Sequence, residues 1–388
     1  MRSVAITNIG SLVTNDESLG LGLLGELHGA AIVVEDGNIA WVGSGTMVPA
    51  TDELIDVEGR TVLPGFVDSH AHLMFAGDRA AEFSARMSGE AYAAGGIRTT
   101  VAATRAASDA ELEANYLHLV AEMRSSGITT FETKSGYGLT VEDEARALRI
   151  ASKHTTETTF LGAHVFPVEF TDRADDYVAL VTGEMLNQVS GSAKWIDVFC
   201  DRGAFTVEQA REILTAGKAV GLLPRIHANQ LQQGGGIQLA VEMDCASADH
   251  CTHFDQADID ALAGSNTVAT LLPGAEFSIR ATYPDARKLW NAGVKVAIAT
   301  DCNPGSSYTT SMPFAIAVAV RDMHFTVEQA IWSATMGGAK ALRRTDIGAI
   351  KVGMRADLID LTAPSALHLA YRPGVNLINH TYTSEAFK

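Results

Sequence analysis

The sequence predicts an α/β fold: a (β/α)8 TIM barrel with a small β-sandwich domain built from both termini. Between residues 61 and 341, short apolar runs alternate with stretches of helical pattern, which is typical of a parallel sheet covered on both faces. Before residue 61 and after residue 341, short strands recur without helices between them. We therefore expect one domain at 1–60 with 342–388 and a barrel at 61–341.

The first sixty residues are expected to form a small β unit. Residues 4–6 are apolar, and the run at 30–34 is followed by Asp36 and Gly37, the strongest short hairpin signal. The chain then returns through the apolar segment 39–42, while 10–28 has the Asn, Asp, Ser and Gly content of a loop.

Eight apolar runs mark the expected barrel strands. They are 62–67, 129–132, 158–163, 195–199, 222–226, 246–250, 267–272 and 294–300. Helical patterns lie between them, and Ser108 and Thr206 are good N-caps for two of these helices. Eight such units over about 240 residues fit a barrel better than an open Rossmann sheet, and no GxGxxG opens a helix here. After the barrel, short strands are expected at 347–352, 356–361 and 375–380.

Composition narrows the class of protein. With 29 Lys and Arg against 46 Asp and Glu, the net charge is −17, which disfavours nucleic acid or an anionic membrane as partner. No window approaches the length of a transmembrane span, and the first ten residues lack the apolar core of a signal peptide. Four scattered cysteines favour reduced thiols in a cytoplasmic protein over a disulfide scaffold. The 35 glycines indicate many tight turns.

Polar residues that follow the strands carry the chemistry, because barrel active sites are built at the carboxyl ends of strands. His70 and His72 follow the first run, and residues two apart on an extended chain point to the same side. His227, His250 and Asp301 end the fifth, sixth and eighth runs.

Three of these histidines and the aspartate form a donor set for one metal ion, Zn²⁺ or Fe²⁺/Fe³⁺. The expected ligands are His70, His72, His227 and Asp301, with an open position for water whose pKa the ion lowers toward about 7. His250 is then placed for proton transfer or polarisation. The alternative is a group of separate polar residues at the barrel mouth that share no ion.

The segment 64–72 (PGFVDSHAH), with His227, His250 and Asp301, resembles the amidohydrolase superfamily. Longer motifs resemble one branch of it: 72–79 (HLMFAGDR), 134–138 (KSGYG), 161–164 (LGAH) and 300–306 (TDCNPGS). That branch hydrolyses the cyclic amide of the small molecule 4-imidazolone-5-propanoate to N-formimidoyl-L-glutamate, the third step of histidine degradation. The resemblance covers essentially the whole chain, and with the large barrel surface it implies a homodimer.

The resemblance implies a substrate-binding set around the flat ring and its propanoate tail: Arg79, Tyr137, His164, Gln230, Asn303, Gly305 and Ser306. Arg79 suits a bidentate contact with the carboxylate, and the alternative is an ordinary surface arginine. Tyr137 and His164 are expected to wall and orient the ring, against the alternative of plain packing residues.

The catalytic residues implied are Asp301, His250 and Gln230. Some members of the superfamily have Glu where Gln230 stands. An amide cannot act as a general base, so proton transfer is assigned to Asp301 and His250, and Gln230 is assigned to substrate hydrogen bonding. The bridging lysine of two-metal relatives would lie on the strand at 195–199, which has none, so we expect one metal.

Two other functions stay open at this point. One is a metal-dependent purine or pyrimidine deaminase of the same superfamily, against which Gln230 counts because these relatives place Glu there. The other is a non-catalytic metal-binding barrel, which would be expected to lack a ligand. The remaining histidines are expected to be surface or packing residues: His28, His118, His154, His253, His324, His368 and His380.

Overall fold

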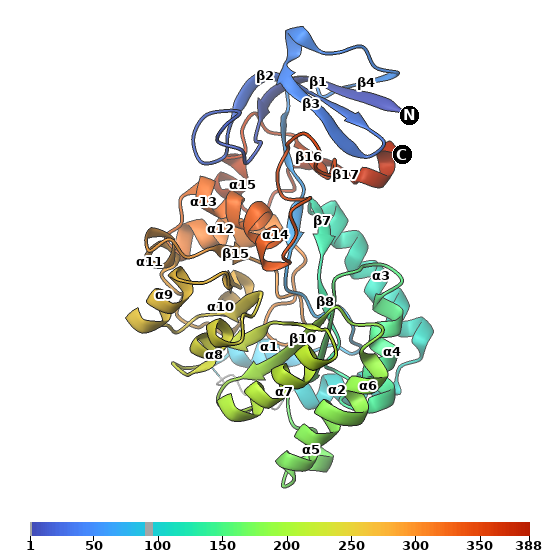
Figure 1. Cartoon of the computed structure of the whole chain (residues 1–388), viewed down its shortest axis with the longest axis vertical. Helices are drawn as coiled ribbons and strands as arrows, with labels where there is room; N and C mark the ends of the chain where they lie inside the picture. Colours follow the sequence, from blue (N-terminus) through green and yellow to red (C-terminus); the bar gives the residue numbers. More distant parts are fainter. Residues whose placement is uncertain (1, 90–95) are drawn as a thin grey trace. The chain divides into compact units, whose positions relative to one another are not determined.

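The computed structural model describes residues 2–89 and 96–388 and has the expected fold class, a (β/α)8 barrel with a small β domain from the termini (Figure 1). The chain divides into two compact units. Unit 1 comprises Met1–Asp68, Ala121–Thr130 and Ser311–Lys388, and unit 2 comprises Ser69–Val120 and Phe131–Thr310.

The described part of unit 1 contains a seven-stranded sheet. Its strands are β1 (Ser3–Leu12), β2 (Leu27–Glu35), β3 (Asn38–Ser44), β4 (Glu53–Asp56), β5 (Thr61–Pro64), β16 (Leu358–Leu361) and β17 (Ile378–Tyr382). The order is β17-β16-β5-β1-β2-β3, with β4 paired to β1, so that strands from both ends of the chain share one sheet.

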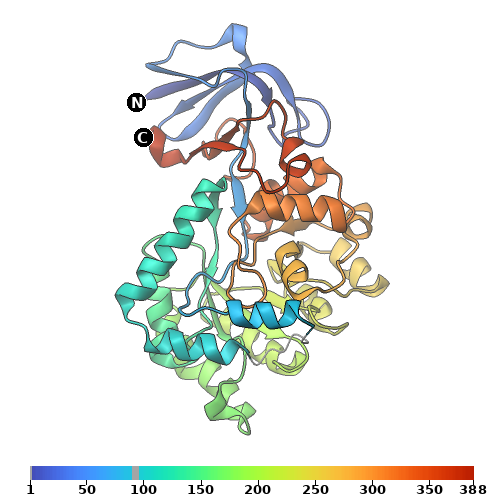
Figure 2. The ribbon, with the colours of Figure 1, turned by 180° about the vertical axis from the view of Figure 1, so that it is seen from behind.

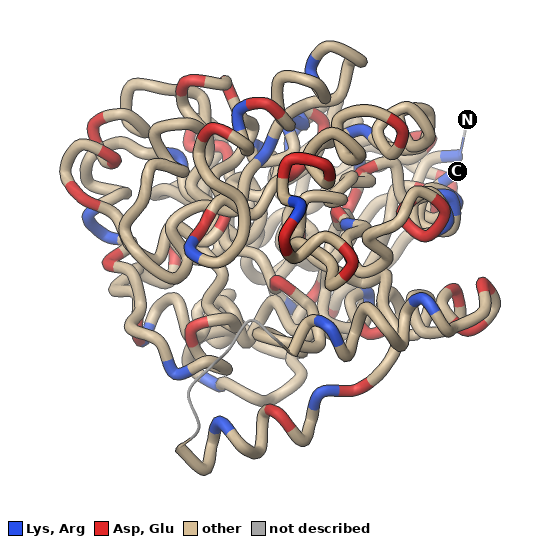
Figure 3. The backbone as a smooth tube through the Cα atoms, turned by 90° about the horizontal axis from the view of Figure 1, so that it is seen from below, with Lys and Arg blue, Asp and Glu red and all other residues tan. Residues whose placement is uncertain are grey.

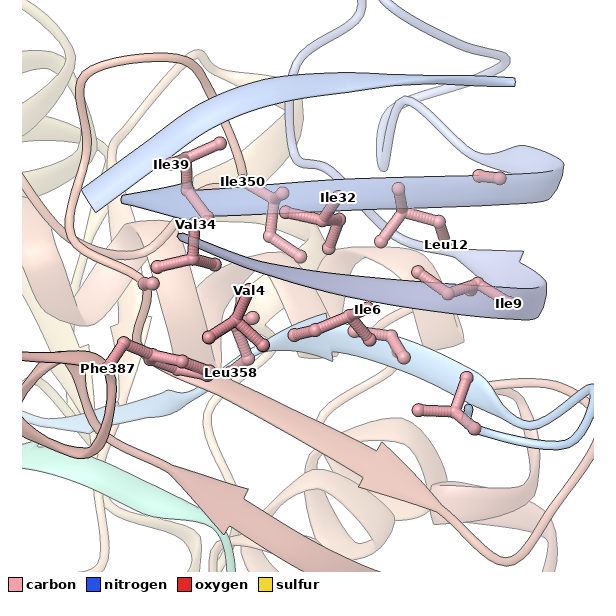
Figure 4. Packing of buried hydrophobic residues seen from close by; sticks show 14 residues of the cluster. Val4, Ile6, Ile9, Leu12, Ile32, Val34, Ile39, Ile350, Leu358 and Phe387 are labelled. Atoms are coloured by element: carbon pink, nitrogen blue, oxygen red, sulfur yellow. The ribbon is translucent and has the colours of Figure 1, made fainter. Parts of the chain in front are cut away.

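The predicted hairpin in this sheet is confirmed. Strands β2 and β3 are antiparallel with Glu35 opposite Asn38, and Asp36 and Gly37 both have positive φ, at 46° and 81°. Left-handed residues at both turn positions match the right-handed twist of the flanking strands. Alternate side chains of β1 and β2, among them Val4 and Ile6, point into a buried apolar cluster (Figure 4).

The apolar run at 62–67 does not form one strand but two. Strand β5 lies in the seven-stranded sheet, and β6 (Phe66–Asp68) pairs instead with β7 (Ile128–Phe131). Gly65 lies at the break, where a Cβ would come within 2.2 Å of Thr129 Cγ2. The backbone can therefore pass from one sheet to the other only because residue 65 has no side chain.

Unit 1 also contains helices α12 (Met312–Asp322), α13 (Val327–Trp332), α14 (Gly338–Ala341) and α15 (His368–Tyr371). The π-helical segment Ser333–Gly337 connects α13 to α14, and short 3-10 turns lie at Gly45–Met47 and Ser384–Phe387. No strand forms at 347–352, where β structure was expected.

Unit 2 contains the parallel sheet of the barrel. Its strands are β8 (Thr133–Lys134), β9 (Thr158–Ala163), β10 (Trp195–Cys200), β11 (Leu223–Pro224), β12 (Ile226–Ala228), β13 (Ser247–His250), β14 (Val268–Leu271) and β15 (Val296–Ile298). The sheet closes on itself through the segment after β6: Ala71 pairs with Cys302, and Lys134 N donates to Ala71 O at 3.0 Å.

Helices follow the barrel strands in chain order. They are α1 (Ala80–Met87), α2 (Ile97–Ala106), α3 (Asp109–Ser125), α4 (Val141–Ala151), α5 (Ala174–Leu180), α6 (Leu186–Val189), α7 (Val207–Ala219), α8 (Gly236–Glu242), α9 (Gln256–Ala263), α10 (Pro273–Ile279) and α11 (Ala286–Asn291). Segment Val168–Phe170 is a 3-10 turn, and Val181–Met185 is π-helical. Helix α1, in blue, is seen best from behind (Figure 2). The two predicted N-caps are confirmed, because Glu111 N donates to Ser108 Oγ and Gln209 N to Thr206 Oγ1.

In the part of the chain that the structure describes, no helix has both the length and the apolar character needed to cross a bilayer. All four cysteines are buried thiols.

Candidate active site

The predicted metal ligands come together at the carboxyl ends of the barrel strands. Two backbone hydrogen bonds place the first and last of them side by side: Asp301 N donates to His70 O at 3.0 Å, and His72 N to Cys302 O at 2.9 Å. His227 lies in β12. Asp301 adopts a left-handed φ of 51°, which is unfavourable for a residue with a side chain and is common at functional sites.

The four predicted ligand residues bring their ligand atoms close together. His72 Nε2 lies 3.3 Å from both His70 Nε2 and His227 Nε2, and Asp301 Oδ1 lies 3.5 Å from the Nε2 atoms of His70 and His72. Nitrogen and oxygen ligands about 2.0–2.2 Å from a zinc ion in tetrahedral geometry would be separated by about these distances. Among the described residues, His70, His72 and His227 form one group with metal-ligand geometry, and His70, His250 and Asp301 form another.

The protonation of the histidines also suits a cation. Burial, followed by nearby positive charge, lowers the pKa of His70, His72 and His250 well below the ordinary value. Neutral imidazoles have lone pairs for a metal, and metal ligands must be deprotonated. Burial raises the pKa of Asp301 well above that of a free aspartate.

Two buried carboxylates orient the ligand rings. Asp249 Oδ2 lies 2.7 Å from His70 Nδ1, and Asp197 Oδ1 lies 3.1 Å from His227 Nδ1. Each carboxylate accepts a hydrogen bond from Nδ1–H. The Nε2 lone pair is then free to face the other ligand atoms, as in carboxylate–histidine–metal sites.

Two buried cations in turn hold these carboxylates. Lys134 Nζ lies 2.9 Å from Asp197 Oδ2 and 3.0 Å from Glu132 Oε1, while Arg225 Nη2 lies 3.0 Å from Asp249 Oδ2. All five side chains are fully buried. Burial acts to raise the pKa of Asp197, but the neighbouring His227 and Lys134 outweigh it and hold that pKa well below its usual range.

Sequence analysis did not assign these five residues to the site. The available signal was their place inside otherwise apolar strands, as for Lys134 at the end of β8 and Asp197 within β10. A charge in such a strand is costly unless it is paired, so each predicts a partner in the barrel interior.

A cavity opens beside the convergent ligand atoms. It is lined by His72, Arg79, Ile97, Tyr137, His164, Val165, Phe199, His227, Gln230, His250, Asp301, Asn303, Gly305 and Ser306. Every candidate site residue lines it except His70, which is fully buried. Ile97, Val165 and Phe199 are apolar wall residues that sequence analysis did not identify.

Arg79 is 7% exposed and contacts an acidic neighbour in the same unit. Its Nε and Nη2 donate to Glu82 at 2.8 and 2.7 Å. A Cβ on Gly305 would lie 2.3 Å from Arg79 Nη1, so the absence of a side chain at residue 305 allows the guanidinium to reach the cavity.

Tyr137 and His164 form an aromatic wall next to the ligand His72. The ring centroids of Tyr137 and His164 are 5.2 Å apart, and that of His164 is stacked 5.3 Å from His72. His164 Nδ1 donates to Gly136 O at 2.9 Å, and burial lowers the pKa of His164 to about 3, so that its ring is neutral.

The turn that follows Asp301 is held by the side-chain amide of Asn303. Its Oδ1 accepts from the backbone N–H groups of Gly305 and Ser306, each at 2.8 Å, and its Nδ2 donates to Asp301 O. Ser306 Oγ donates to Asp301 Oδ2 at 3.3 Å. Asn303 therefore fixes the shape of the cavity rim and the direction of the Asp301 carboxylate.

A family profile described as the amidohydrolase family matches residues 61–372. The chain belongs to that family and, within it, to the imidazolonepropionases, as its curated relatives show. It is 64% identical over 385 residues to an imidazolonepropionase of Streptomyces griseus subsp. griseus, covering 99% of each chain. It is 63% identical to one of Mycolicibacterium smegmatis, covering 97% of this chain and 96% of the relative.

Solved structures with lower identity share the fold. A crystal structure of an adenosine deaminase from Xanthomonas campestris with bound zinc superposes with a TM-score of 0.73 at 17% identity, covering 99% of this chain and 92% of that one. The bound zinc belongs to that neighbour; among the described residues of the present chain, buried histidines form a group that could hold a metal ion.

Proposed function

We propose that this chain hydrolyses the ring amide of 4-imidazolone-5-propanoate to give N-formimidoyl-L-glutamate, as the name of its relatives implies. One structural observation carries the proposal: two groups of three possible metal ligands share His70 beside a cavity that also reaches the buried guanidinium of Arg79. The substrate combines a cyclic amide with an anionic tail, and the cavity offers a group of matching chemistry for each part.

The residues present fit a metal ion on the observed distances and on charge. Apart from Arg79, which pairs with Glu82, and Glu276, whose pKa burial raises to about 7, the buried charges around the histidines are two cations and four carboxylates: Lys134, Arg225, Glu132, Asp197, Asp249 and Asp301. When all six are ionised, one doubly charged ion balances the group, and unbalanced buried charge is costly. His70, His72, His227 and Asp301 would hold the ion, Zn²⁺ or Fe²⁺/Fe³⁺. Such an ion polarises a carbonyl and lowers the pKa of a coordinated water.

The proton transfers fall to residues of the chain. The Asp301 carboxylate accepts a proton from the attacking water and delivers it to the departing ring nitrogen. His250, buried and neutral, lies beside the same point and steadies the oxygen of the carbonyl under attack. Gln230 hydrogen-bonds the substrate and takes no proton.

Substrate binding follows the shape of the cavity. Arg79 binds the propanoate, with Gly305 allowing close approach. Tyr137 and His164 face the ring, and Ser306 lies at the rim beside Asp301. Asn303 belongs to the same set through the turn that it holds.

We further propose that the protein is a cytoplasmic homodimer that binds neither nucleic acid nor membrane. We also propose two functional domains, one formed by 1–60 with 342–388 and the other by 61–341. The acidic balance of −17 disfavours nucleic acid and anionic membranes as partners, and the four buried thiols support the cytoplasmic location. Light scattering of the purified protein tests the dimer, and a monomer at micromolar concentration contradicts it.

The test of the function is a direct assay. Purified protein is incubated with imidazolone propanoate, guanine and cytosine in parallel, and the absorbance of each is followed while metal content is measured on the same sample. We expect turnover of imidazolone propanoate alone, about one metal per chain, and loss of turnover with a chelator that added Zn²⁺ or Fe²⁺ reverses. Turnover of guanine or cytosine in place of imidazolone propanoate would contradict the proposal.

A further inference from the structure

The loop that presents Tyr137 to the cavity is bound by one buried carboxylate. Glu144 lies in the first turns of α4 and is fully buried. Its Oε1 accepts from the backbone N–H groups of Gly138 and Leu139 at 3.0 and 2.8 Å, and its Oε2 accepts from that of Gly136 at 2.9 Å. The carboxylate thus holds the chain on both sides of Tyr137.

The conformation of this loop needs such an acceptor. Gly136 and Leu139 both have left-handed backbones, with φ of 104° and 57°, and Leu139 does so although it has a side chain. The N–H groups at 136, 138 and 139 lie outside any helix or strand. Buried N–H groups without an acceptor would cost free energy, so the loop holds this shape while the carboxylate is present.

Separate contacts hold the carbonyl groups of the same loop. Gly136 O accepts from His164 Nδ1 at 2.9 Å, and Gly138 O accepts from Arg105 Nε at 2.6 Å. The backbone flanking Tyr137 is thereby fixed, and the Tyr137 ring is 3% exposed with its centroid 6.0 Å from that of His72.

We propose that Glu144 is a positioning residue for substrate binding, which acts by setting the loop conformation that presents Tyr137 to the ring of the substrate. The inference rests on the proposed function, because it assigns Tyr137 to substrate contact. Glu144 lines no part of the cavity and therefore acts only through the loop.

The acceptor character of both Glu144 oxygens is part of this role. A carboxylate offers acceptor lone pairs on both oxygens, whereas glutamine places an NH₂ donor on one side. In the Glu144→Gln variant, an NH₂ at the Oε2 position would leave Gly136 N–H only its longer contact to Oε1, at 3.2 Å. An NH₂ at the Oε1 position would place a donor against the N–H groups of both Gly138 and Leu139. Glu144→Gln therefore releases one side of the loop without removing the bulk of the side chain.

The test separates binding from chemistry. We expect Glu144→Gln to raise KM about tenfold while kcat changes less than about threefold and metal content stays at the wild-type value. Glu142→Gln is the matched control, since Glu142 lies exposed on the same helical turn and its substitution removes the same charge. It should leave KM unchanged.

A double-mutant cycle then tests the route through the loop. In a Tyr137→Ala background, Glu144→Gln should change KM less than about twofold, because the group that it positions is gone. Glu144→Asp, which keeps the charge but shortens the reach, is measured alongside, so that a folding failure of the glutamine variant leaves a second readout. An unchanged KM in both variants, or the same tenfold effect without Tyr137, would overturn the inference. Wild-type protein that fails to turn over imidazolone propanoate would instead overturn the proposed function.

Discussion

The two carboxylate oxygens of Asp301 have different neighbours: Oδ1 faces the histidine nitrogens, and Oδ2 accepts a hydrogen bond from Ser306. Asparagine fills the same volume and tolerates the left-handed φ, but it cannot accept the proton of the attacking water. Asp301→Asn should therefore lower kcat by about 10³-fold or more while the circular dichroism spectrum stays unchanged.

Asp244→Asn is the matched control, because Asp244 also has a left-handed φ, at 52°, and is exposed. Full activity in Asp301→Asn, or equal losses in both variants, would contradict the role of Asp301.

Lys134 is buried between Glu132 and Asp197, so that its removal would take the lysine from Asp197 and leave Glu132 with Arg225, whose Nη1 lies 3.8 Å from Glu132 Oε1. Lys134→Met should lower metal affinity about 10-fold or more, since Asp197 orients His227, and should reduce the free energy of unfolding by about 3–5 kcal/mol. Metal affinity by chelator competition and denaturant unfolding are the two measurements.

Lys153→Met provides the comparison, because Lys153 pairs with Glu113 at 3.0 Å and its side chain is 52% exposed. An exposed pair contributes about 0–1 kcal/mol, so this variant should keep its metal and most of its stability. Equal effects of the two substitutions would show that burial of the Lys134 pairs carries no special weight.

The sequence was enough to predict that the polar residues at the strand ends lie near one another. The carboxyl ends of the parallel strands lie on the same face of the barrel, independently of which side chains fill its interior. His70, His227 and Asp301 were predicted in this way, and in the structure His70 shares one ligand group with His227 and another with Asp301. The partners of His70 and His227 were not predicted, since the pairing of Asp249 with one ring and Asp197 with the other depends on strand register. Register follows from packing across the sheet, which one sequence does not specify.

At the scale of elements, hydrophobic patterns predicted the strands better than their ends. The run at 62–67 is continuously apolar, yet it serves two sheets because Gly65 lets the chain pass close to Thr129. Similarly, the segment at 222–226 is divided into β11 and the start of β12. A run of apolar residues indicates that the segment is buried. Because the residues on both sides of such a break are buried, the pattern does not show where one strand ends and the next begins.

Helix α7 has a complete capping box, in which Gln209 N donates to Thr206 Oγ1 and Thr206 N to Gln209 Oε1. Thr206→Ala should lower the free energy of unfolding by about 1 kcal/mol, because one N-terminal N–H of the helix loses its acceptor. Urea unfolding measures the effect, and Thr206→Ser should restore most of it. Thr206 does not line the cavity, so kcat/KM should be unchanged in both variants. A drop in kcat/KM would indicate that the cap also influences the site.

At the scale of the whole molecule, the net negative charge of the protein should repel the anionic propanoate of the proposed substrate at long range. Asp and Glu residues are distributed along the whole chain and are interspersed with Lys and Arg (Figure 3), and the net charge is −17. Salt screens exposed charges beyond a Debye length and buried ones much less, so the repulsion should weaken before the contact with buried Arg79 does.

We therefore expect kcat/KM to rise by about twofold or more between about 10 and 150 mM salt at constant metal loading. Steady-state assays over that range provide the measurement. A fall in kcat/KM with added salt would show instead that local attraction controls the encounter.

The position of β16 beside β5 has a consequence for the sheet while the chain is being synthesised. Strand β5 ends at Pro64, but the strand that covers its edge, β16, begins only at Leu358. Ribosomes add about 5–20 residues per second, so the edge of the nascent sheet stays open for roughly 15–60 s while about 300 further residues are translated. An open edge can pair with another chain, so premature termination anywhere before β16 should release aggregation-prone fragments rather than a working barrel.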